Sequence, residues 1–171
     1  MNMKTKFKKL HEGAVLPKKA TEGPAAYDLY VPEDIIIKPG RQIIPLGFAM
    51  EMQLGYEALI DARSGFSSKG MEGHLVGEVF SEDGYARSEE KVMSLKPTRF
   101  DCDVLQGKID SDYRDGVGVI VHSRTDNEFL VKAGTRIAQM TFHKVETVEW
   151  EETDTLSETD RDGGFGSTGT N

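Results

Sequence analysis

Cysteine and long apolar runs are both scarce in this 171-residue sequence. The one cysteine, Cys102, excludes an internal disulfide and fits a reducing cytoplasm. Because Cys102 lies between Asp101 and Asp103, whose charges disfavour the thiolate, we expect an inert thiol. No stretch approaches the ~20 apolar residues that cross a bilayer. The lysine-rich start has no apolar segment after it, so we expect neither a membrane span nor a signal peptide, and a cytoplasmic protein.

Basic residues are also in the minority, since 29 acidic residues and 21 basic residues give a net charge of −8. Duplex nucleic acid is bound through a basic surface, so we do not expect stable duplex binding. A small anionic ligand is compatible with this charge, because a few local cations and backbone amides are enough to hold it. The four histidines show no spacing typical of a zinc site.

What the sequence does contain is a series of short β-like segments separated by Gly, Pro, Asp and Asn. The predicted strands are residues 25–30, 35–37, 41–45, 48–52, 56–62, 108–109, 117–122, 128–131, 137–144 and 148–150. Such close spacing indicates an all-β sandwich or barrel, and the length fits one domain. We expect one short helix near residues 65–70.

Two segments differ from the rest of the chain. Residues 74–103 are rich in charge and contain scattered apolar residues without clean alternation. Residues 151–171 begin as an acidic tail and end in a glycine-rich stretch, and a tail with so little to bury is expected to be mobile. We therefore predict a β core over residues 1–150, with an inserted segment at about 74–103, and a flexible arm over residues 151–171.

The heptapeptide Gly107–Tyr113 places Asp110, Asp112 and a phenol within four positions, directly before a turn. Asp is unfavourable in strands, so its presence here needs a reason. One interpretation is an ordinary solvated turn. The other is a hairpin that directs a carboxylate at a reacting water and lays the ring of Tyr113 against a ligand.

Two further segments have the residue types that bind phosphate. Arg63-Ser64-Gly65 follows a predicted strand and offers a guanidinium, a hydroxyl and backbone amides; the alternative is an N-capped turn with a surface arginine. The glycine-rich segment around Phe165 lacks the lysine of a P-loop. Its phenylalanine either makes unspecific apolar contacts from a disordered segment or belongs to an arm whose ring stacks on a base.

Single polar residues interrupt two of the predicted strands. Asp28 is either a strand-end aspartate or an outer ligand of a hydrated magnesium ion. Gln139 is a polar position in the strand-like run 136–142, where a satisfied sheet residue is the ordinary interpretation.

Taken in order, these segments resemble the five motifs of the trimeric deoxyuridine triphosphatases (dUTPases). The matching segments are Ala26–Leu29, Arg63–Gly65 with Lys69-Gly70, Gly107–Tyr113, Arg136–Met140, and Arg161 with Gly164–Gly169. The resemblance covers residues of about 20 to 169. It implies a jelly-roll (β-clip) fold, a homotrimer with shared active sites, and Mg2+-dependent hydrolysis of dUTP to dUMP and pyrophosphate. That reaction keeps uracil out of DNA and supplies the dTMP precursor.

The resemblance also implies roles for individual residues. Asp110 would activate the water that attacks the α-phosphorus, and Asp28 would hold magnesium through water. Tyr113 would pack under the deoxyribose and exclude a 2′-hydroxyl. The residues implied to bind the uracil, the phosphates and the ring stack are Gly107, Lys108, Ile109, Arg63, Ser64, Gly65, Gln139, Arg161, Phe165, Gly166, Ser167 and Thr168.

The sequence departs from the family pattern in two main places. Arg161 is four residues before Phe165, where five is usual. About 30 extra residues, 74–103, separate the second and third motifs. This segment makes the chain resemble the dUTPases of staphylococcal-type phages, some of which bind repressor proteins. It therefore implies a host-cytoplasmic phage enzyme with a repressor partner at 74–103; the alternative is a neutral surface elaboration.

Two rival hypotheses stay open at this point. One is a dCTP deaminase, which shares the fold but is disfavoured by the Ile109–Tyr113 hairpin and the arm. The other is a regulatory protein-binding module in which catalysis is secondary.

Overall fold

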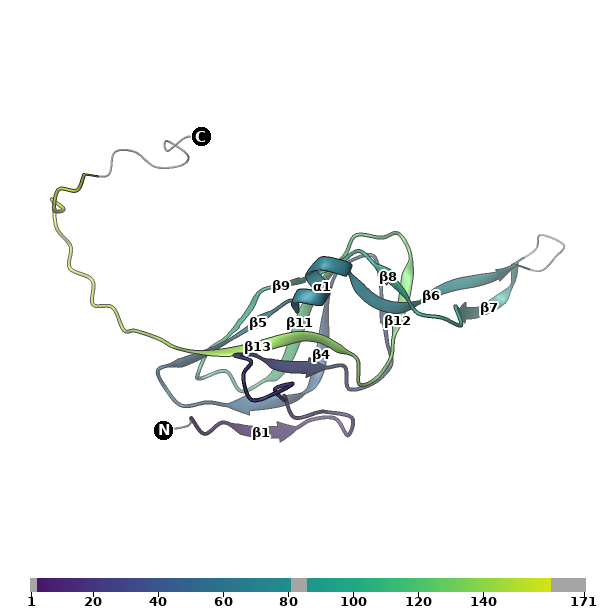
Figure 1. Cartoon of the computed structure of the whole chain (residues 1–171), viewed down its shortest axis with the longest axis horizontal. Helices are drawn as coiled ribbons and strands as arrows, with labels where there is room; N and C mark the ends of the chain where they lie inside the picture. Colours follow the sequence, from purple (N-terminus) through teal and green to yellow (C-terminus); the bar gives the residue numbers. More distant parts are fainter. Residues whose placement is uncertain (1–2, 81–85, 161–171) are drawn as a thin grey trace.

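A computed structural model describes the backbone of residues 3–80 and 86–160, and the side chains of residues 3–77 and 93–160. Within these ranges nearly all of the regular secondary structure is β-strand (Figure 1). The strands are β1 Lys6–Lys9, β2 Tyr27–Tyr30, β3 Ile35–Ile37, β4 Gly40–Glu51, β5 Tyr56–Asp61, β6 Met71–Phe80, β7 Ala86–Met93, β8 Thr98–Phe100, β9 Cys102–Leu105, β10 Gly107–Ile109, β11 Gly116–Ser123, β12 Glu128–Val131 and β13 Arg136–Lys144. Helix α1 covers Ser64–Lys69. The predicted all-β jelly roll with one short helix is confirmed.

The strands form antiparallel sheets whose order brings distant parts of the sequence together. One sheet has the order β1-β4-β11-β9, and a second has the order β10-β5-β13-β2. A third has the order β3-β12-β6-β7, with β8 paired to β6. The second sheet contains four of the strands that carry or adjoin the candidate motifs, so it is the frame on which the site is built.

The core lies between these sheets and follows from the alternation of side chains along each strand. In β11 every second residue is buried, namely Val117, Val119, Val121 and Ser123. These valines belong to one cluster with Ile44 and Phe48 of β4, Ile60 of β5 and Met140 of β13. Because both principal sheets contribute to one core, the candidate motifs sit on a common rigid support.

Strand β4 corrects one prediction. The sequence predicts separate strands at 41–45 and 48–52, but a single strand runs from Gly40 to Glu51. Gly47 lies within it at φ 71°, a conformation that glycine adopts at no steric cost. Its carbonyl accepts hydrogen bonds from the amides of Leu10 and His11 at 2.8 and 3.0 Å. The strand continues through this irregularity because it pairs with β1 beyond Gly47.

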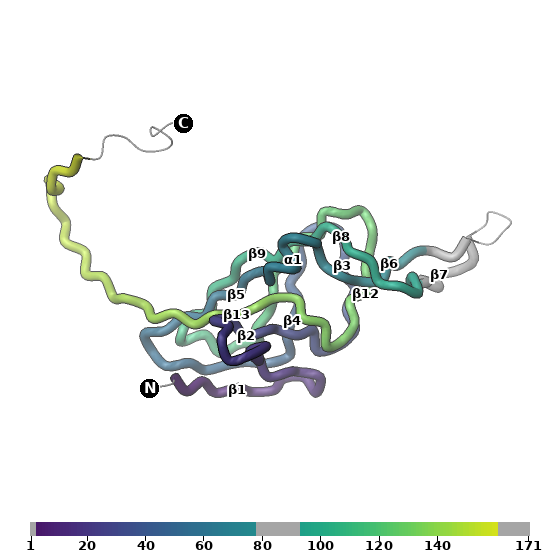
Figure 2. The backbone as a smooth tube through the Cα atoms, viewed as in Figure 1, coloured from purple at the N-terminus to yellow at the C-terminus, as the bar shows by residue number. Residues whose placement is uncertain are grey.

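The charged segment 74–103 contains strands that the sequence analysis did not predict. Strands β6 and β7 pair as a hairpin that extends away from the rest of the molecule (Figures 1 and 2). Its base is fixed by β8, where the buried ring of Phe100 stacks on Phe129 at 4.0 Å. Gly70 permits the close approach, since a Cβ there would lie 2.3 Å from the Phe100 carbonyl oxygen. The base of the hairpin is therefore part of the core.

Residues 145–160 have no regular secondary structure and run away from the sheets (Figure 1). The predicted strand at 148–150 is therefore wrong for a single copy of the chain, since these residues pair with no strand in the part that the structure describes. Trp150 is 91% exposed and Leu156 is 88% exposed. None of the described helices has the length and hydropathy to cross a membrane.

Candidate active site

Three polar side chains form a row across the sheet β10-β5-β13-β2. Gln139 of β13 is directly opposite Asp28 of β2 on one side and Asp61 of β5 on the other. Directly opposed residues of antiparallel strands project from the same face. The fold thus places Asp28 and Gln139, two predicted site residues, side by side. Asp61 adjoins them and was not predicted.

Asp28 is a buried carboxylate held by two arginines. Its residue is 9% exposed, and its Oδ1 lies 2.9 Å from Nε of Arg63. Its Oδ2 accepts a hydrogen bond from Nη1 of Arg136 at 3.2 Å. A buried charge without such partners would be strongly destabilising. The sequence analysis assigned no role to Arg136, the second of these arginines. Its place at the start of the motif Arg136–Met140 was the one sign in the sequence that it belongs to the site.

The side chain of Arg63 is held by contacts within the protein. It is the N-cap residue of α1, but its side chain makes no capping hydrogen bond. The guanidinium instead faces Asp28, and its Nη1 donates to the carbonyl oxygen of Arg136 at 3.4 Å. The guanidinium is therefore partly committed to the protein, with its remaining N–H groups left to reach a ligand.

Ser64 and Gly65 lie in the first turn of α1 and are exposed. The Arg63 carbonyl accepts hydrogen bonds from the amides of Phe66 and Ser67, each at 2.9 Å. The amides of Ser64 and Gly65 precede these, where a helix has no intrahelical acceptor for them. A Cβ built on Gly65 meets nothing within 4 Å. A hydroxyl, two amides and open space therefore lie next to the arginine pair.

A groove of about 580 Å³ adjoins this cluster. Gly65 and Phe66 of α1 line it on one side, and Pro97 of the segment before β8 lines it on the other. It has five cationic side chains in its lining and one carboxylate, that of Glu72; the cations are Arg63, Lys69, Arg99, Lys132 and Arg136. Four of these cations are ion-paired, Arg63 and Arg136 with Asp28, Arg99 with Glu72, and Lys132 with Asp34. The remaining excess of positive charge is compatible with a small anionic ligand, as the sequence analysis allowed.

The predicted hairpin is present at the other end of β5. Strand β10 pairs with β5 so that Gly107 is opposite Ile60 and Ile109 is opposite Ala58. Lys108 forms an ion pair with Glu57, and the hydrogen bond to that carboxylate raises the pKa of Lys108. Asp110 follows directly and is exposed. Strand β10 is at the edge of its sheet, so the backbone groups on its outer side face away from any neighbouring strand.

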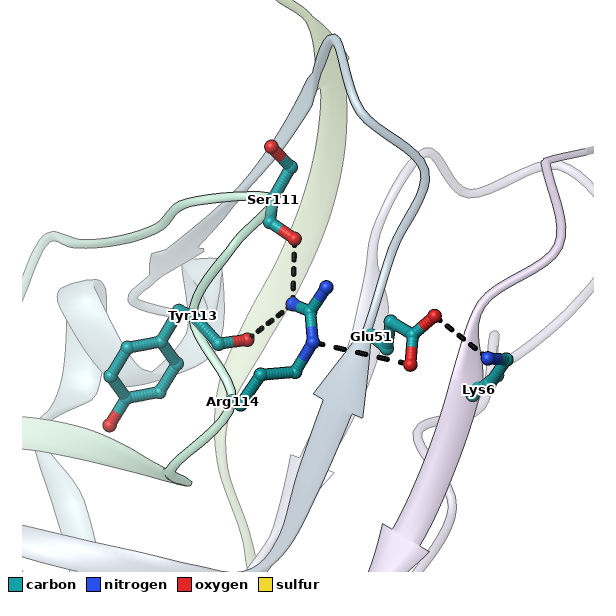
Figure 3. A network of polar contacts seen from close by, with 5 residues as sticks. All are labelled: Lys6, Glu51, Ser111, Tyr113 and Arg114. Atoms are coloured by element: carbon teal, nitrogen blue, oxygen red, sulfur yellow. Dashed lines mark hydrogen bonds and ion pairs between the residues drawn. The ribbon is translucent and has the colours of Figure 1, made fainter.

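The loop that carries Asp110 and Tyr113 is closed by hydrogen bonds to its carbonyl groups. The Tyr113 amide donates to the Asp110 carbonyl at 3.1 Å, and the Tyr113 hydroxyl donates to the Gly116 carbonyl at 3.0 Å. Arg114 donates to the carbonyls of Ser111 and Tyr113 (Figure 3). Tyr113 is 40% exposed. The loop is thus ordered, with the phenol ring available at the surface.

One copy of the chain does not bring these two groups together. The register puts Asp110 beside Glu57, whereas Arg63 is six positions further along the same chain, roughly 15–20 Å away at about 3.3 Å per strand residue. The structure therefore assembles Asp28, Arg63, Ser64, Gly65 and Gln139 at one end of β5, and Asp110 and Tyr113 at the other. Arg161, Phe165, Gly166, Ser167 and Thr168 lie outside the described residues.

No group of three or more His, Cys, Asp or Glu side chains that could bind a metal occurs in the described part of the chain. A magnesium ion held directly by protein ligands does not fit these residues. Each Asp28 oxygen has capacity beyond its one arginine contact. An outer contact to a hydrated magnesium that is bound mainly by phosphates does fit, since this ion usually keeps several waters.

Cys102 behaves as expected for an inert thiol. It is buried, and burial together with Asp103 and Asp101 raises its pKa to about 12. A thiol with such a pKa has essentially no thiolate at neutral pH, so a cysteine nucleophile is excluded here.

In comparisons with known proteins, the chain matches one family. The dUTPase family model matches residues 12–84 and 100–169, and leaves unmatched residues 85–99, inside the predicted insert. The deoxyuridine 5′-triphosphate nucleotidohydrolase of Helicobacter pylori (strain J99) is 33% identical over 169 residues, covering 98% of this chain and 97% of that protein. The Hydrogenobaculum sp. (strain Y04AAS1) enzyme of the same name is 38% identical over 170 residues, covering 98% of this chain and 99% of that protein.

Among solved structures, the Staphylococcus bacteriophage 80alpha dUTPase with dUPNHPP superposes with a TM-score of 0.74 at 21% identity. The match covers 98% of this chain and 99% of that one. A point mutant of the dUTPase from phage phi11 of S. aureus, described with a structural Mg(II) ion, has a TM-score of 0.67 at 17% identity. That match covers 90% of this chain and 98% of the phage protein.

Proposed function

The chain belongs to the dUTPase family and is a dUTP nucleotidohydrolase, and we propose that it cleaves dUTP to dUMP and pyrophosphate at sites shared between three copies. The observation that carries the shared site is the separation of the two groups along β5. A triphosphate held near Ser64 is too far from Asp110 of the same copy, so the base must come from a neighbour. Exposed Trp150 and Leu156, on an arm that leaves its own sheets, support association between copies.

At the Asp28 end, the proposed task is to bind and neutralise the triphosphate. The Ser64 hydroxyl, the Gly65 amide and the Gln139 amide would donate hydrogen bonds to phosphate oxygens. Arg63 and Arg136 would add positive charge while staying fixed by Asp28. Preorganised donors of this kind stabilise charge that develops on oxygen during the reaction.

At the Asp110 end, the proposed tasks are recognition of the nucleoside and activation of water. The outer backbone groups of Gly107, Lys108 and Ile109, on an edge strand, suit the alternating donors and acceptors of a uracil edge. The ring of Tyr113 would pack under the deoxyribose and leave no room for a 2′-hydroxyl. Asp110 would take the proton of the water that attacks the α-phosphorus, with pyrophosphate as the leaving group.

Magnesium is the proposed cofactor, with Asp28 as an outer ligand through water. Bound to the triphosphate, the ion would supply positive charge that lowers repulsion between the phosphates and an attacking water. The arm would close over a neighbour's site, with Phe165 stacked on uracil and Arg161, Gly166, Ser167 and Thr168 near the outer phosphates. Closure of such a segment excludes bulk water from the reaction.

Mixed oligomers test the shared site. Asp110→Asn removes the proposed base, and Ser64→Asp puts a negative charge where phosphate is proposed to bind; both positions are exposed, so both variants should fold. Each variant alone should be inactive, while trimers refolded from an equal mixture should regain about one quarter of wild-type activity, because a site needs one intact group from each of two copies. As the control for refolding, Asp112→Asn takes the place of Asp110→Asn in the mixture with Ser64→Asp, and about half of the wild-type activity should return because Asp112→Asn keeps both proposed groups. A mixture that stays inactive would contradict sharing.

A second role as a ligand of a repressor protein is proposed for the segment 74–103. It is supported by the projecting β6–β7 hairpin, by the unmatched residues 85–99, and by the exposed side chains of Leu75, Met93 and Leu95 at the hairpin base. Replacing residues 78–92 with a short turn, together with serine at positions 75, 93 and 95, should preserve dUTP hydrolysis and abolish binding to the repressor. Binding that survives this replacement would exclude the hairpin as the docking surface.

A further inference from the structure

The loop between β10 and β11 depends on a side chain to which neither the motif nor the proposed mechanism gives a role. Arg114 directly follows Tyr113 and is exposed. Its Nη1 donates to the Ser111 carbonyl at 2.7 Å and to the Tyr113 carbonyl at 2.9 Å. This nitrogen carries two hydrogens, so each carbonyl can receive its own hydrogen bond.

These two bonds fix the backbone on both sides of Asp112. A carbonyl group sets the plane of the peptide that follows it, because the peptide unit is planar. Arg114 thus fixes the 111–112 and 113–114 peptides, while the Tyr113 amide closes the turn onto the Asp110 carbonyl. Asp110 and Tyr113 are the two ends of this turn. Their relative orientation is therefore set by the guanidinium as well as by the strands.

The same guanidinium is tied to a third element. Its Nε lies 4.0 Å from Oε2 of Glu51 at the end of β4, and Oε1 of Glu51 accepts a hydrogen bond from Lys6 at 2.8 Å. Figure 3 shows Arg114 between the two loop carbonyls and this carboxylate. Arg114 thus links the loop to β4 and to the N-terminal strand. A planar guanidinium can reach carbonyls and carboxylate from different edges at once, which a lysine ammonium cannot.

We propose that Arg114 is a positioning residue that holds Asp110 and Tyr113 in the geometry needed for attack and for sugar selection. The inference rests on the proposed roles of those two residues. Without the guanidinium, the two carbonyls would be bonded to water and the loop would sample other conformations. The competent conformation would then be less populated, which lowers turnover of dUTP. Conformations in which the Tyr113 ring lies away from the sugar would accept a ribose, so rejection of the 2′-hydroxyl would decline as well.

The test compares pyrophosphate release from dUTP and from UTP in otherwise unchanged full-length protein. Arg114→Ala should lower kcat/KM for dUTP by about tenfold, the loss expected when two hydrogen bonds to an exposed loop are removed. The ratio of kcat/KM for dUTP to that for UTP should fall by a similar factor, and Arg114→Lys should lie between Arg114→Ala and wild type. A residue that only stabilises the fold would shift the melting temperature without moving this ratio.

Arg124→Ala is the matched control, because Arg124 is an exposed arginine at the opposite end of β11 and is ion-paired with Asp103. Its kcat/KM for dUTP and its dUTP-to-UTP ratio should both stay within about twofold of wild type, as for a typical surface substitution. An unchanged dUTP-to-UTP ratio in folded Arg114→Ala would overturn the inference. Tyr113→Ala distinguishes a failure of the proposed role of Tyr113 from a failure of the inference about Arg114. If Tyr113→Ala also leaves the dUTP-to-UTP ratio unchanged, the proposed role of Tyr113 is wrong and the inference is wrong with it. If the dUTP-to-UTP ratio falls in Tyr113→Ala and is unchanged in Arg114→Ala, only the inference is wrong.

Discussion

The two ends of β5 differ in how their polar side chains are held in place. At the Asp28 end, a buried carboxylate, a glutamine and Arg136 lie on paired strands, and Arg63 at the start of α1 reaches the same carboxylate, so the charges are fixed by the sheet and the helix beside it. At the Asp110 end, an exposed carboxylate and a half-exposed phenol sit on a loop held by bonds to its own carbonyls. Stability should therefore depend mainly on the first end, and selectivity on the second.

This difference would allow the proposed site to be divided between copies. The proposed phosphate-binding end needs close, opposed charges, which neighbouring elements of one copy supply. The proposed base and nucleoside-reading groups would approach a ligand from outside, which an edge strand and a loop can do. In the proposed trimer, each copy would present one half of a site at each end of β5.

The largest effect is expected from Asp110→Asn. Removal of the base should reduce kcat for dUTP by about 10²–10⁴-fold. Because Asp110 is exposed, the melting temperature should stay within about 1–2 °C of wild type. Binding of a non-hydrolysable dUTP analogue should stay close to that of wild type. Pyrophosphate release, a thermal melt and a titration with the analogue measure the three quantities.

Asp112→Asn is the control for Asp110→Asn, since it removes the other carboxylate of the same turn. It should retain turnover within about twofold. Equal losses in the two variants would mean that the charge of the loop matters and that Asp110 has no special role as the base.

Asp28→Asn should show the opposite pattern in stability. It leaves Arg63 and Arg136 facing a neutral amide at a buried position. Breaking a fully buried pair costs about 3–5 kcal/mol. The two arginine side chains are 30% and 47% exposed, so we expect about 2 kcal/mol and a fall in melting temperature of about 4–8 °C. A melting temperature equal to that of Asp110→Asn would remove the contrast between the two ends.

Sequence reasoning predicted the parts of this site better than their arrangement. Alternation and turn residues found α1 and all four strands of the second sheet, because those signals are local. Strands β1 and β6–β9 were missed, since their pairing depends on partners far away in the chain, and the segment 148–150 was predicted to be a strand although one copy gives it no partner. The contact of Arg136 with Asp28 spans 108 positions, so no local pattern could show that this arginine faces that carboxylate.

The smallest effect is expected from Glu51→Gln, which probes how the loop is attached. The hydrogen bond from Lys6, followed by the charges of Lys6 and Arg114, lowers the pKa of Glu51 below its ordinary value of 4.5. Its contribution to stability is therefore complete above pH 4.5 and is lost as the pH falls through the folded-state value. Thermal melts should show Glu51→Gln slightly below wild type at neutral pH, with the difference shrinking as the pH falls below 4.5 and in high salt. The dUTP-to-UTP ratio should change less than in Arg114→Ala, because the two carbonyl bonds remain. A difference in melting temperature that grows with acid would show that Glu51 stabilises the fold by something other than its charge.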